Sequence, residues 1–327
     1  MRVSLDTGAI TSLDQNRGIG VYAEQLIKRL PQYVKVVNKK PQLTHCLVFK
    51  LFLRSRQWAT PTVVTIHDLI PLKYPQAYPP GLRGRLKWWR QKLKLRQAAG
   101  IITDSQASKQ DIIKFTGIDA ERIHVVYLAA DEIFKPVKAV NQLALPDKFV
   151  LYVGDLNWNK NVVSLTKICL KLHYPLVVVG RQAVATDYDH NHPETSELIK
   201  FQRLAKAHPK LIIRLGVLPA EDLAGVYNLA TIYVQPSRDE GFGLPVLEAM
   251  ASGCPVLSSA KGSLPEITGK AGLIFNQTNL KLVWQNMEWR RKLVQVGLIQ
   301  AKKFSWEKTV RETVKVYEKI ITDRSNH

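Results

Sequence analysis

Residues 232–253 read IYVQPSRDEGFGLPVLEAMASG, and this stretch decides the fold. Its first four residues form a short apolar run, which is typical of a strand buried on both faces of a parallel sheet. A polar loop follows, and then a helix of about two turns is expected, because Pro245 suits a first helical position and Gly253 suits the position after the last. A strand, a loop and a helix in this order are the repeating unit of an α/β protein.

Similar units occupy most of the chain. Further apolar runs predict strands at 34–37, 62–66, 100–103, 124–127, 149–153, 176–179, 211–215 and 255–258, and helical periodicity falls between them at 20–30, 106–115, 162–171 and 220–229. The length of 327 residues suits two domains. A Pro-flanked segment at 135–147 without periodic pattern predicts the linker between them. We therefore expect two Rossmann-like, doubly wound α/β domains facing a cleft, at 1–140 and 147–304.

Composition excludes several classes of protein. Hydrophobic residues at 46% and charged residues at 23% are ordinary for a folded chain, so disorder and fibrous structure are excluded. The three cysteines have no zinc-ligand spacing, and no apolar run approaches the ~20 residues that cross a bilayer. The N-terminus does not read as a signal peptide, so we expect a cytoplasmic protein. The unusual value is the net charge of +20, which indicates an anionic partner.

The loop after 232–235 carries the candidate chemistry. Ligands bind open α/β sheets at the carboxyl ends of the strands, where this loop lies. Glu248 lies one turn into the helix and helical side chains tilt toward the N-terminus, so its carboxylate is expected to share a site with Glu240. Backbone amides at a helix start bind phosphate, and here they belong to Gly241, Phe242, Gly243 and Leu244. The alternative, that both acids only complement the helix dipole, accounts less well for the glycines and Pro245 around them.

The stretch from Glu240 to Glu248 resembles the E-x7-E signature of retaining GT-B glycosyltransferases of the family 4 type. The resemblance continues in the family's order and covers nearly the whole chain, at 17–22, 65–71, 101–105, 152–154, 160–161, 262–267 and 304–306. It implies two Rossmann-like domains around a cleft, with a nucleotide-diphosphate sugar held mainly by the second. It also implies that the last segment, 305–327, is a helix crossing back to the first domain.

The resemblance also implies roles for single residues. Glu240 contacts the transferred sugar, Glu248 the ribose hydroxyls and Lys160 the diphosphate. It implies a retaining reaction without a metal, in which the leaving phosphate takes the acceptor's proton. The segment 67–71 and the pair at 160–161 look most like the mannosyltransferase branch, so GDP-mannose is the first expected donor and UDP-glucose the second. The spacing Asp187-Tyr188-Asp189 matches the metal-binding motif of the other glycosyltransferase fold, but we interpret it as a solvated loop.

The first half of the chain contributes two further candidates. Gly18-Ile19-Gly20 follows a strand-like segment at 3–5 and opens a helix, so its backbone is expected to approach the donor closely. His67 ends the predicted strand 62–66, where it is expected to hydrogen-bond an acceptor hydroxyl or the transferred sugar. The alternative for His67 is a strand-end histidine whose ring is satisfied by the backbone.

Two positions depart from the family pattern. Asp155 and Asn159 stand where relatives carry an arginine of the diphosphate clamp, which leaves Lys160, with Arg181 and Arg238 as possible substitutes. A degenerate sugar-nucleotide-binding protein is therefore one alternative, and a GT-B nucleotide-sugar epimerase is another. Nucleic-acid binding rests only on charge and is the least favoured, since no recognition motif supports it.

The densest positive charge has its own interpretation. No acidic residue lies between Asp68 and Asp104, and the segment from Gly81 to Ala98 carries seven cations. Leu82, Leu86, Trp89, Leu93 and Gln97 recur among them at helical spacing, with Trp88 and Leu95 in addition. This composition is typical of a helix at an anionic membrane surface, and equally of a helix packed on its domain with a solvated basic face. Docking would suit a lipid-linked or other glycan acceptor and a peripheral site on the inner face of the cell membrane.

Overall fold

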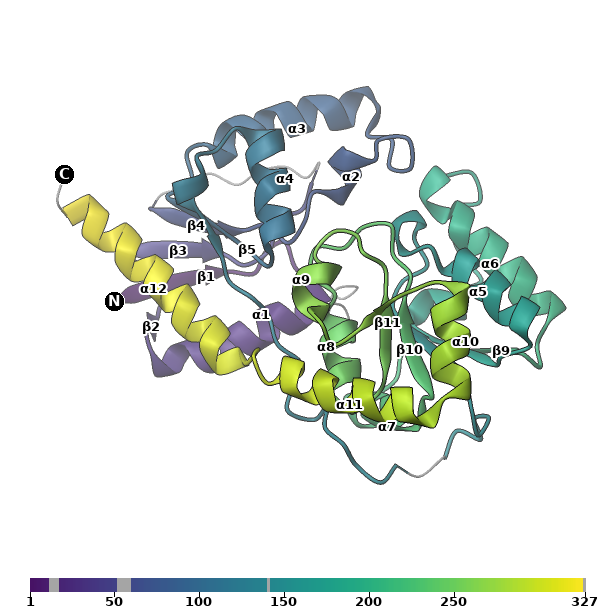
Figure 1. Ribbon diagram of the computed structural model, residues 1–327. Coiled ribbons are helices and arrows are strands. Elements are labelled where there is room, and N and C mark those ends of the chain that lie inside the picture. Colours follow the sequence, from purple (N-terminus) through teal and green to yellow (C-terminus); the bar gives the residue numbers. More distant parts are fainter. Residues whose placement is uncertain (12–17, 52–59, 140–141, 326–327) are drawn as a thin grey trace. The chain divides into compact units, whose positions relative to one another are not determined.

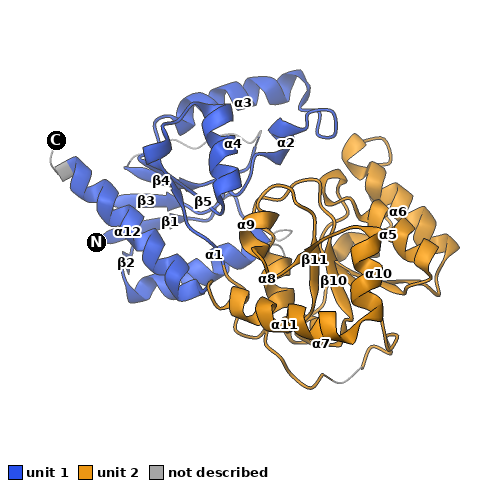
Figure 2. Ribbon diagram, in the orientation of Figure 1, with its two compact units in different colours: residues 1–128, 305–327 blue, residues 129–304 orange. Residues whose placement is uncertain are grey.

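The computed structural model describes residues 1–11, 18–51, 60–139 and 142–325, which form two compact units (Figures 1 and 2). Unit 1 comprises Met1–Leu128 and Ser305–His327, and unit 2 comprises Ala129–Phe304. After the chain enters unit 2, Val137 N and Lys135 O are both hydrogen bonded to the side chain of Asn228. The segment predicted as a linker therefore packs, in part, on unit 2.

Unit 1 contains a six-stranded parallel sheet in the order β2-β1-β3-β4-β5-β6. The strands are β1 (Arg2–Asp6), β2 (Lys35–Val36), β3 (Leu43–Cys46), β4 (Thr62–Thr65), β5 (Gly100–Thr103) and β6 (Ile123–Val125). The helices are α1 (Gly18–Arg29), α2 (Ile70–Lys73), α3 (Gly81–Leu95), α4 (Gln106–Thr116) and α12 (Trp306–Ser325), with short 3-10 turns η2 (Leu30–Gln32) and η3 (Ala120–Arg122).

Unit 2 contains a second six-stranded parallel sheet in the order β12-β11-β10-β7-β8-β9. The strands are β7 (Val150–Val153), β8 (Leu176–Val179), β9 (Ile212–Leu215), β10 (Ile232–Gln235), β11 (Val256–Ser258) and β12 (Leu273–Ile274). The helices are α5 (Val162–Leu172), α6 (Ser196–Ala207), α7 (Ala220–Leu229), α8 (Leu244–Ala251), α9 (Leu264–Thr268), α10 (Gln277–Gln285) and α11 (Met287–Ala301), with 3-10 turns η4 (Trp158–Lys160), η5 (Arg181–Ala183) and η6 (Pro193–Thr195).

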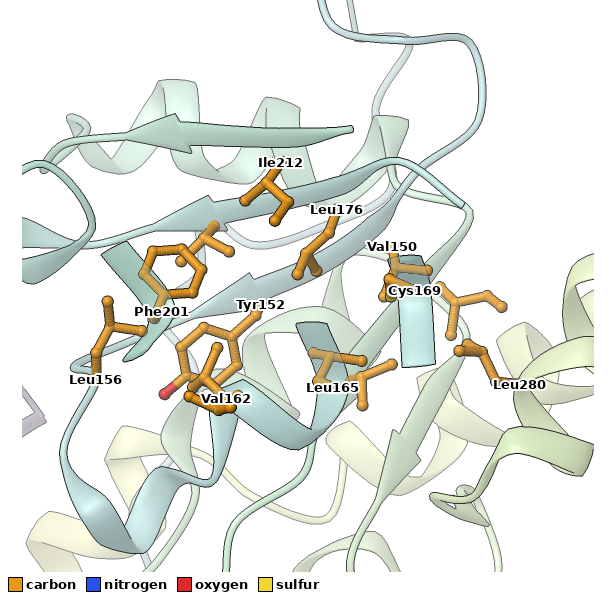
Figure 3. Close-up of a cluster of buried hydrophobic side chains, with 14 of the residues drawn as sticks. Val150, Tyr152, Leu156, Val162, Leu165, Cys169, Leu176, Phe201, Ile212 and Leu280 are labelled. Carbon is orange, nitrogen blue, oxygen red and sulfur yellow. The ribbon is translucent and has the colours of Figure 1, made fainter. Parts of the chain in front are cut away.

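The core of unit 2 explains why its strands read as continuous apolar runs. Tyr152 on β7 and Leu176 on β8 are fully buried and pack with Leu165 of α5 and Phe201 of α6 (Figure 3). Every residue of β8 and β10 is buried. Full burial of one such side chain stabilises the fold by about 1.5–3 kcal/mol, so both faces of these strands select apolar residues.

The α/β class, both parallel sheets and most predicted strands are confirmed. The prediction was incomplete for β3 and β12, which it did not contain, and it made β2 too long. Thr44 and His45 interrupt the apolar character of β3, although the strand lies inside the sheet. Helix α8 begins at Leu244, with Pro245 in its first turn as expected.

A chain of buried polar groups joins α12 to the sheet of unit 1. The Tyr317 hydroxyl lies 2.5 Å from His45 Nδ1, and His45 Nε2 lies 2.7 Å from Thr65 Oγ1. The same Thr65 oxygen lies 2.8 Å from the Tyr22 hydroxyl of α1. Burial lowers the pKa of His45 to about 3, so its ring is neutral and one ring nitrogen accepts a hydrogen bond while the other donates one. One polar chain therefore links α12, β3, β4 and α1.

We predict that Tyr317→Phe loosens α12, because it leaves a buried nitrogen of His45 without its partner, at a cost of about 1–3 kcal/mol. Amide hydrogen exchange in residues 306–325 should become faster, and the melting temperature should fall. Tyr33→Phe is the matched control, since its hydroxyl also bonds to α12, through Glu307, but at an exposed position. Equal effects of the two substitutions would contradict the assignment.

Candidate active site

The loop between β10 and α8 carries the candidate site of unit 2. Glu240 lies in this loop and Lys160 ends η4, which follows β7, and β7 and β10 are neighbours in the sheet. Both residues therefore come from the carboxyl edge of the sheet, where ligands bind in α/β folds. Gly243 at the start of α8 has φ of +97°, and a Cβ there would lie 2.8 Å from Leu264 Cδ2, so the loop requires glycine at this position.

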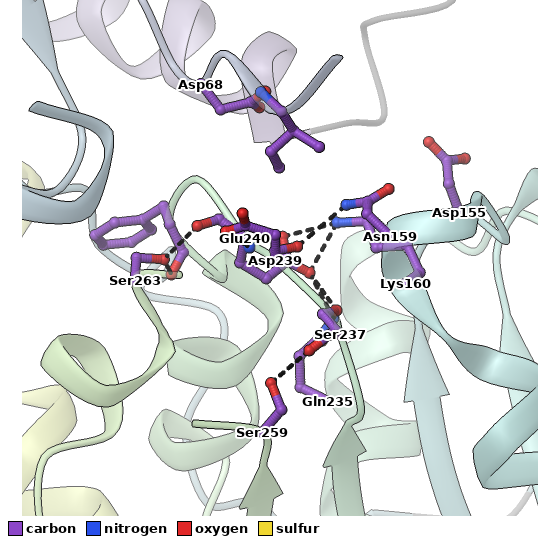
Figure 4. A network of polar contacts seen from close by, with 12 residues as sticks. Asp68, Asp155, Asn159, Lys160, Gln235, Ser237, Asp239, Glu240, Ser259 and Ser263 are labelled. Carbon is purple, nitrogen blue, oxygen red and sulfur yellow. Dashed lines mark hydrogen bonds and ion pairs between the residues drawn. The ribbon is translucent and has the colours of Figure 1, made fainter. Parts of the chain in front are cut away.

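The Glu240 carboxylate is buried and is bound by three side chains (Figure 4). Lys160 Nζ lies 2.8 Å from each of its two oxygens. Gln235 Nε2 and Ser237 Oγ also donate to Oε1, at 2.8 and 2.7 Å. Glu240 and Lys160 thus form one half-buried ion pair. The family resemblance implied a separate contact for each, Glu240 to the sugar and Lys160 to the diphosphate.

The loop is held from two sides by residues that contact its backbone. The backbone carbonyl of Asn159 accepts from Arg238 N at 2.7 Å, and the side-chain Nδ2 of Asn159 donates to Asp239 O at 3.2 Å. On the other side, Ser263 Oγ donates to the carbonyl oxygens of Glu240 and Phe242, at 3.1 and 2.7 Å (Figure 4). These contacts position the Glu240 carboxylate without touching it.

A second glycine explains how Ser263 comes so close. A Cβ on Gly262 would lie 2.4 Å from Asp239 Oδ1 and 2.5 Å from Glu240 N, distances that no side chain can occupy. Gly262 also has φ of +57°, which glycine adopts without strain. In the sequence, the segment 262–267 shows only a resemblance to the family, and the structure shows that it contacts the Glu240 loop.

Glu248 occupies a different environment on α8. Its Oε2 accepts a hydrogen bond from the Tyr227 hydroxyl of α7 at 2.9 Å, and both side chains are buried. Burial raises the pKa of Glu248 to about 7, the Tyr227 bond opposes this, and the Asp131 charge adds to it. Near neutral pH this carboxyl group is therefore only partly ionised. Tyr227 was not a sequence candidate, because its contact joins residues 21 positions apart.

The predicted phosphate-binding amides lie where the sequence placed them. Gly241, Phe242 and Gly243 precede α8, and Leu244 is its first residue. Pro245 has no N–H, and Val246 N donates to Gly243 O at 2.9 Å. An anion at this helix start would therefore be bound by the amides of residues 241–244, which stays a prediction.

The two candidate substitute cations differ in their surroundings. The Arg238 guanidinium pairs with Glu197 at 3.3 Å, donates to Trp158 O and lies 4.8 Å from the centre of the Trp158 ring. Arg181 is exposed on η5. Arg238 therefore serves the protein's own packing, and a phosphate contact by either arginine stays a prediction.

In unit 1, the ring of His67 is bound by a carboxylate. His67 follows β4, and its Nδ1 lies 2.6 Å from Asp104 Oδ2, at the end of the neighbouring strand β5. Burial lowers the pKa of His67, but the Asp104 charge and hydrogen bond, with smaller contributions from Asp68 and the Leu47 backbone, raise it by more. The net effect is a raised pKa. The alternative of a ring satisfied by backbone alone does not describe this histidine, and Asp104 was not a sequence candidate.

Gly18 and Gly20 form the first turn of α1, as the sequence predicted. Gly18 is exposed and has open space where a Cβ would project, whereas Gly20 is buried. Close approach of a ligand to Gly18 is compatible with this space and stays a prediction.

Residues 1–11, 18–51, 60–139 and 142–325 contain neither a cluster of metal ligands nor a membrane-spanning helix. No three His, Cys, Asp or Glu side chains gather there as metal ligands. Asp187 and Asp189 lie in a loop and are exposed, as predicted. Within the same ranges, no helix combines the length and the apolar character that crossing a bilayer requires.

Comparison with known proteins defines the family. The family model described as glycosyl transferases group 1 matches residues 134–289, and the glycosyltransferase family 4 model matches residues 18–132. O-antigen chain mannosyltransferase B of Escherichia coli is 30% identical over 279 residues, which cover 78% of this chain and 70% of that protein. The serotype-specific mannosyltransferase WbdA of Escherichia coli is 30% identical over 284 residues, 80% of this chain but only 34% of that longer protein.

Solved structures agree on the fold. HepE of Anabaena, solved with UDP and glucose, superposes with a TM-score of 0.71 over 97% of this chain and 99% of that chain, at 15% identity. The two parallel-sheet units thus form a GT-B fold. The chain belongs to the group 1 glycosyltransferases of the family 4 type, and by class it is a hexosyltransferase.

The environment of Glu248 predicts a pH-dependent stability. Its ordinary pKa of 4.5 rises to about 7 in the folded protein. Below 4.5 the group is protonated in both states and has no effect. As the pH rises from 4.5 through 7 the unfolded state ionises first, so this group destabilises the fold by up to about 3 kcal/mol at higher pH.

Glu248→Gln should therefore raise the melting temperature by several degrees at pH 8 and by little at pH 4, as measured by scanning calorimetry. Glu288→Gln, at an exposed position on α11, is the control and should change little at either pH. A Glu248→Gln variant that is less stable than the wild type at pH 8 would refute the assigned environment.

Proposed function

We propose that this enzyme transfers a hexose, mannose first, from a nucleoside-diphosphate sugar to a hydroxyl group of a glycan or lipid-linked acceptor. The transfer retains the anomeric configuration and uses no metal ion. Two relatives that are mannosyltransferases by name support mannose, with GDP-mannose as donor. The neighbour solved with UDP and glucose supports UDP-glucose as the second candidate.

The observation that carries the proposal is the ion pair of Glu240 and Lys160 beside the start of α8. A buried carboxylate accepts hydrogen bonds from sugar hydroxyls, and an ammonium group with nearby backbone amides stabilises negative charge on a leaving diphosphate. These are the two requirements of sugar transfer from a nucleotide. The acceptor's proton passes to the leaving phosphate, so the protein's part is electrostatic.

The other candidates account for less of the site. A degenerate binding protein would have no need for both carboxylates with Lys160, and all three are present and buried or half-buried. A nucleotide-sugar epimerase is distinguished by its product, since incubation with donor alone would yield an epimerised donor. The transferase would give only slow hydrolysis of the donor.

Thermal-shift screening with GDP-mannose, UDP-glucose and an ADP-sugar should identify one donor that raises the melting temperature. With that donor and a lipid-linked or oligosaccharide acceptor, Glu240→Gln should lower transfer by about 100-fold or more, which corresponds to loss of a charged contact in the transition state. Activity should be unchanged by EDTA. Full activity of Glu240→Gln, or no shift with any donor, would refute the proposal.

We further propose that α3 binds an anionic membrane surface. Its buried residues are Gly84, Gln91 and Leu95, and Gln91 Nε2 donates to Lys50 O at 2.9 Å. A separate apolar stripe is exposed, to 84% at Leu82 and 57% at Trp89, and it also contains Leu86 and Leu93. The helix is therefore packed on unit 1 and still presents a Trp-bearing apolar stripe flanked by cations, the composition of an interfacial helix.

Sedimentation with liposomes tests this surface. Wild-type protein should bind vesicles that contain anionic lipid and bind neutral vesicles weakly, because each cation near the surface contributes ~1 kcal/mol. The double substitution Leu86→Ser with Trp89→Ser should weaken binding by about tenfold or more. Ile299→Ser, at an exposed apolar position on α11, is the control. Equal binding of the stripe variant and the control would refute docking through α3.

A further inference from the structure

One oxygen of the Glu240 carboxylate receives most of its hydrogen bonds. Oε1 lies 2.8 Å from Lys160 Nζ, 2.8 Å from Gln235 Nε2 and 2.7 Å from Ser237 Oγ. Oε2 receives Lys160 Nζ at 2.8 Å, and no other described residue donates to it. A carboxylate oxygen has two lone pairs, so Oε1 is filled and Oε2 keeps acceptor capacity.

The groups that fill Oε1 are held rigidly. Gln235 ends β10 and Ser237 follows two residues later, and both are almost completely buried. Gln235 Nε2 also lies 2.8 Å from Ser237 Oγ, so the two side chains support each other (Figure 4). The Ser259 hydroxyl donates to the carbonyl of Ser237 and fixes its backbone.

A tyrosine sets the direction of the Gln235 amide. The Tyr233 hydroxyl, also buried on β10, donates to Gln235 Oε1. Burial and the charges of Tyr152 and Glu240 raise the pKa of Tyr233 well above its ordinary value, so it stays a donor. With its oxygen bound to Tyr233, the amide of Gln235 can only present its nitrogen to Glu240.

We propose that Gln235 and Ser237 are positioning residues that hold Oε1 of Glu240, so that Oε2 alone accepts a single hydroxyl group of the transferred sugar. This inference rests on the proposed function and makes it more specific. A carboxylate free at both oxygens could bind two vicinal hydroxyls, whereas this one recognises one hydroxyl position.

Donor analogues that each lack one sugar hydroxyl test the recognition of a single position. The series is built on GDP-mannose or UDP-glucose, whichever the wild-type enzyme binds, and binding is measured by calorimetry. Removal of one particular hydroxyl should weaken binding about tenfold or more, and removal of either neighbour should have a much smaller effect. Equal losses at two adjacent positions would overturn the proposal.

Ser237→Ala tests positioning directly. It should weaken binding of the sugar donor about tenfold while binding of the nucleoside diphosphate alone changes by less than about twofold. The penalty for the missing hydroxyl should shrink in this variant, because a loosened carboxylate no longer distinguishes positions. Ser237→Thr keeps the donor and should restore most of the affinity, and the buried Ser258→Ala on β11 is the control.

Gln235→Met provides a second variant if Ser237→Ala does not fold, and it should show the same split between donor and nucleotide. Wild-type affinity for the donor in both Ser237→Ala and Gln235→Met would overturn the positioning role and leave the proposed function intact. A uniform loss for donor and nucleotide would also overturn it, since that is the result of a purely structural role. If the wild-type enzyme binds no nucleotide sugar, both proposals fail.

Discussion

The site of unit 2 depends on the pairing of β7 with β10. These strands are neighbours in register, with Ile232 opposite Val150 and Tyr233 opposite Leu151. Because both strands run in the same direction, the loops at their carboxyl ends begin side by side, and Lys160 meets Glu240 across 80 positions of sequence. The contacts of Asn159 and Ser263 with the loop hold Glu240 beside Lys160. The geometry of the site therefore depends directly on the strand pairing of the fold.

Glu240 and Glu248 have the same side chain but different hydrogen-bond partners. Each is buried, and they lie eight residues apart. Glu240 has an ammonium partner and two further donors, which replace the solvation that burial removes. Glu248 has one phenolic donor, too little to offset burial, so its pKa rises to about 7. The first carboxylate thus has three side-chain donors in place of water, and the second gains a proton near neutral pH.

The sequence predicted the layers of the fold better than the contacts of the site. Strands buried on both faces need apolar residues, so β7, β8 and β10 could be predicted. Strand β3 could not, because Thr44 bonds to Thr60 and His45 belongs to the buried polar chain of unit 1. The pattern of a loop followed by a helix correctly predicted that Glu240 and residues 241–243 lie in the loop, and that Leu244 and Glu248 lie on α8. Partners such as Tyr227 and Asp104 could not be predicted. Each contacts a side chain from a different helix or strand, and the neighbouring sequence contains no pattern that indicates such a contact.

One of the two departures from the family pattern, Asn159, acquires a physical meaning in the structure. The side chain of Asn159 donates from Nδ2 to Asp239 O, and its backbone carbonyl accepts from Arg238 N, so the side chain supplies one hydrogen-bond donor to the Glu240 loop. Arg238 is paired with Glu197, so its charge is already balanced. The excess of +20 over the whole chain is therefore not gathered around Glu240. The densest positive charge lies on α3, beside an exposed apolar stripe. The residues that carry most of the excess charge are therefore different from the residues of the candidate active site.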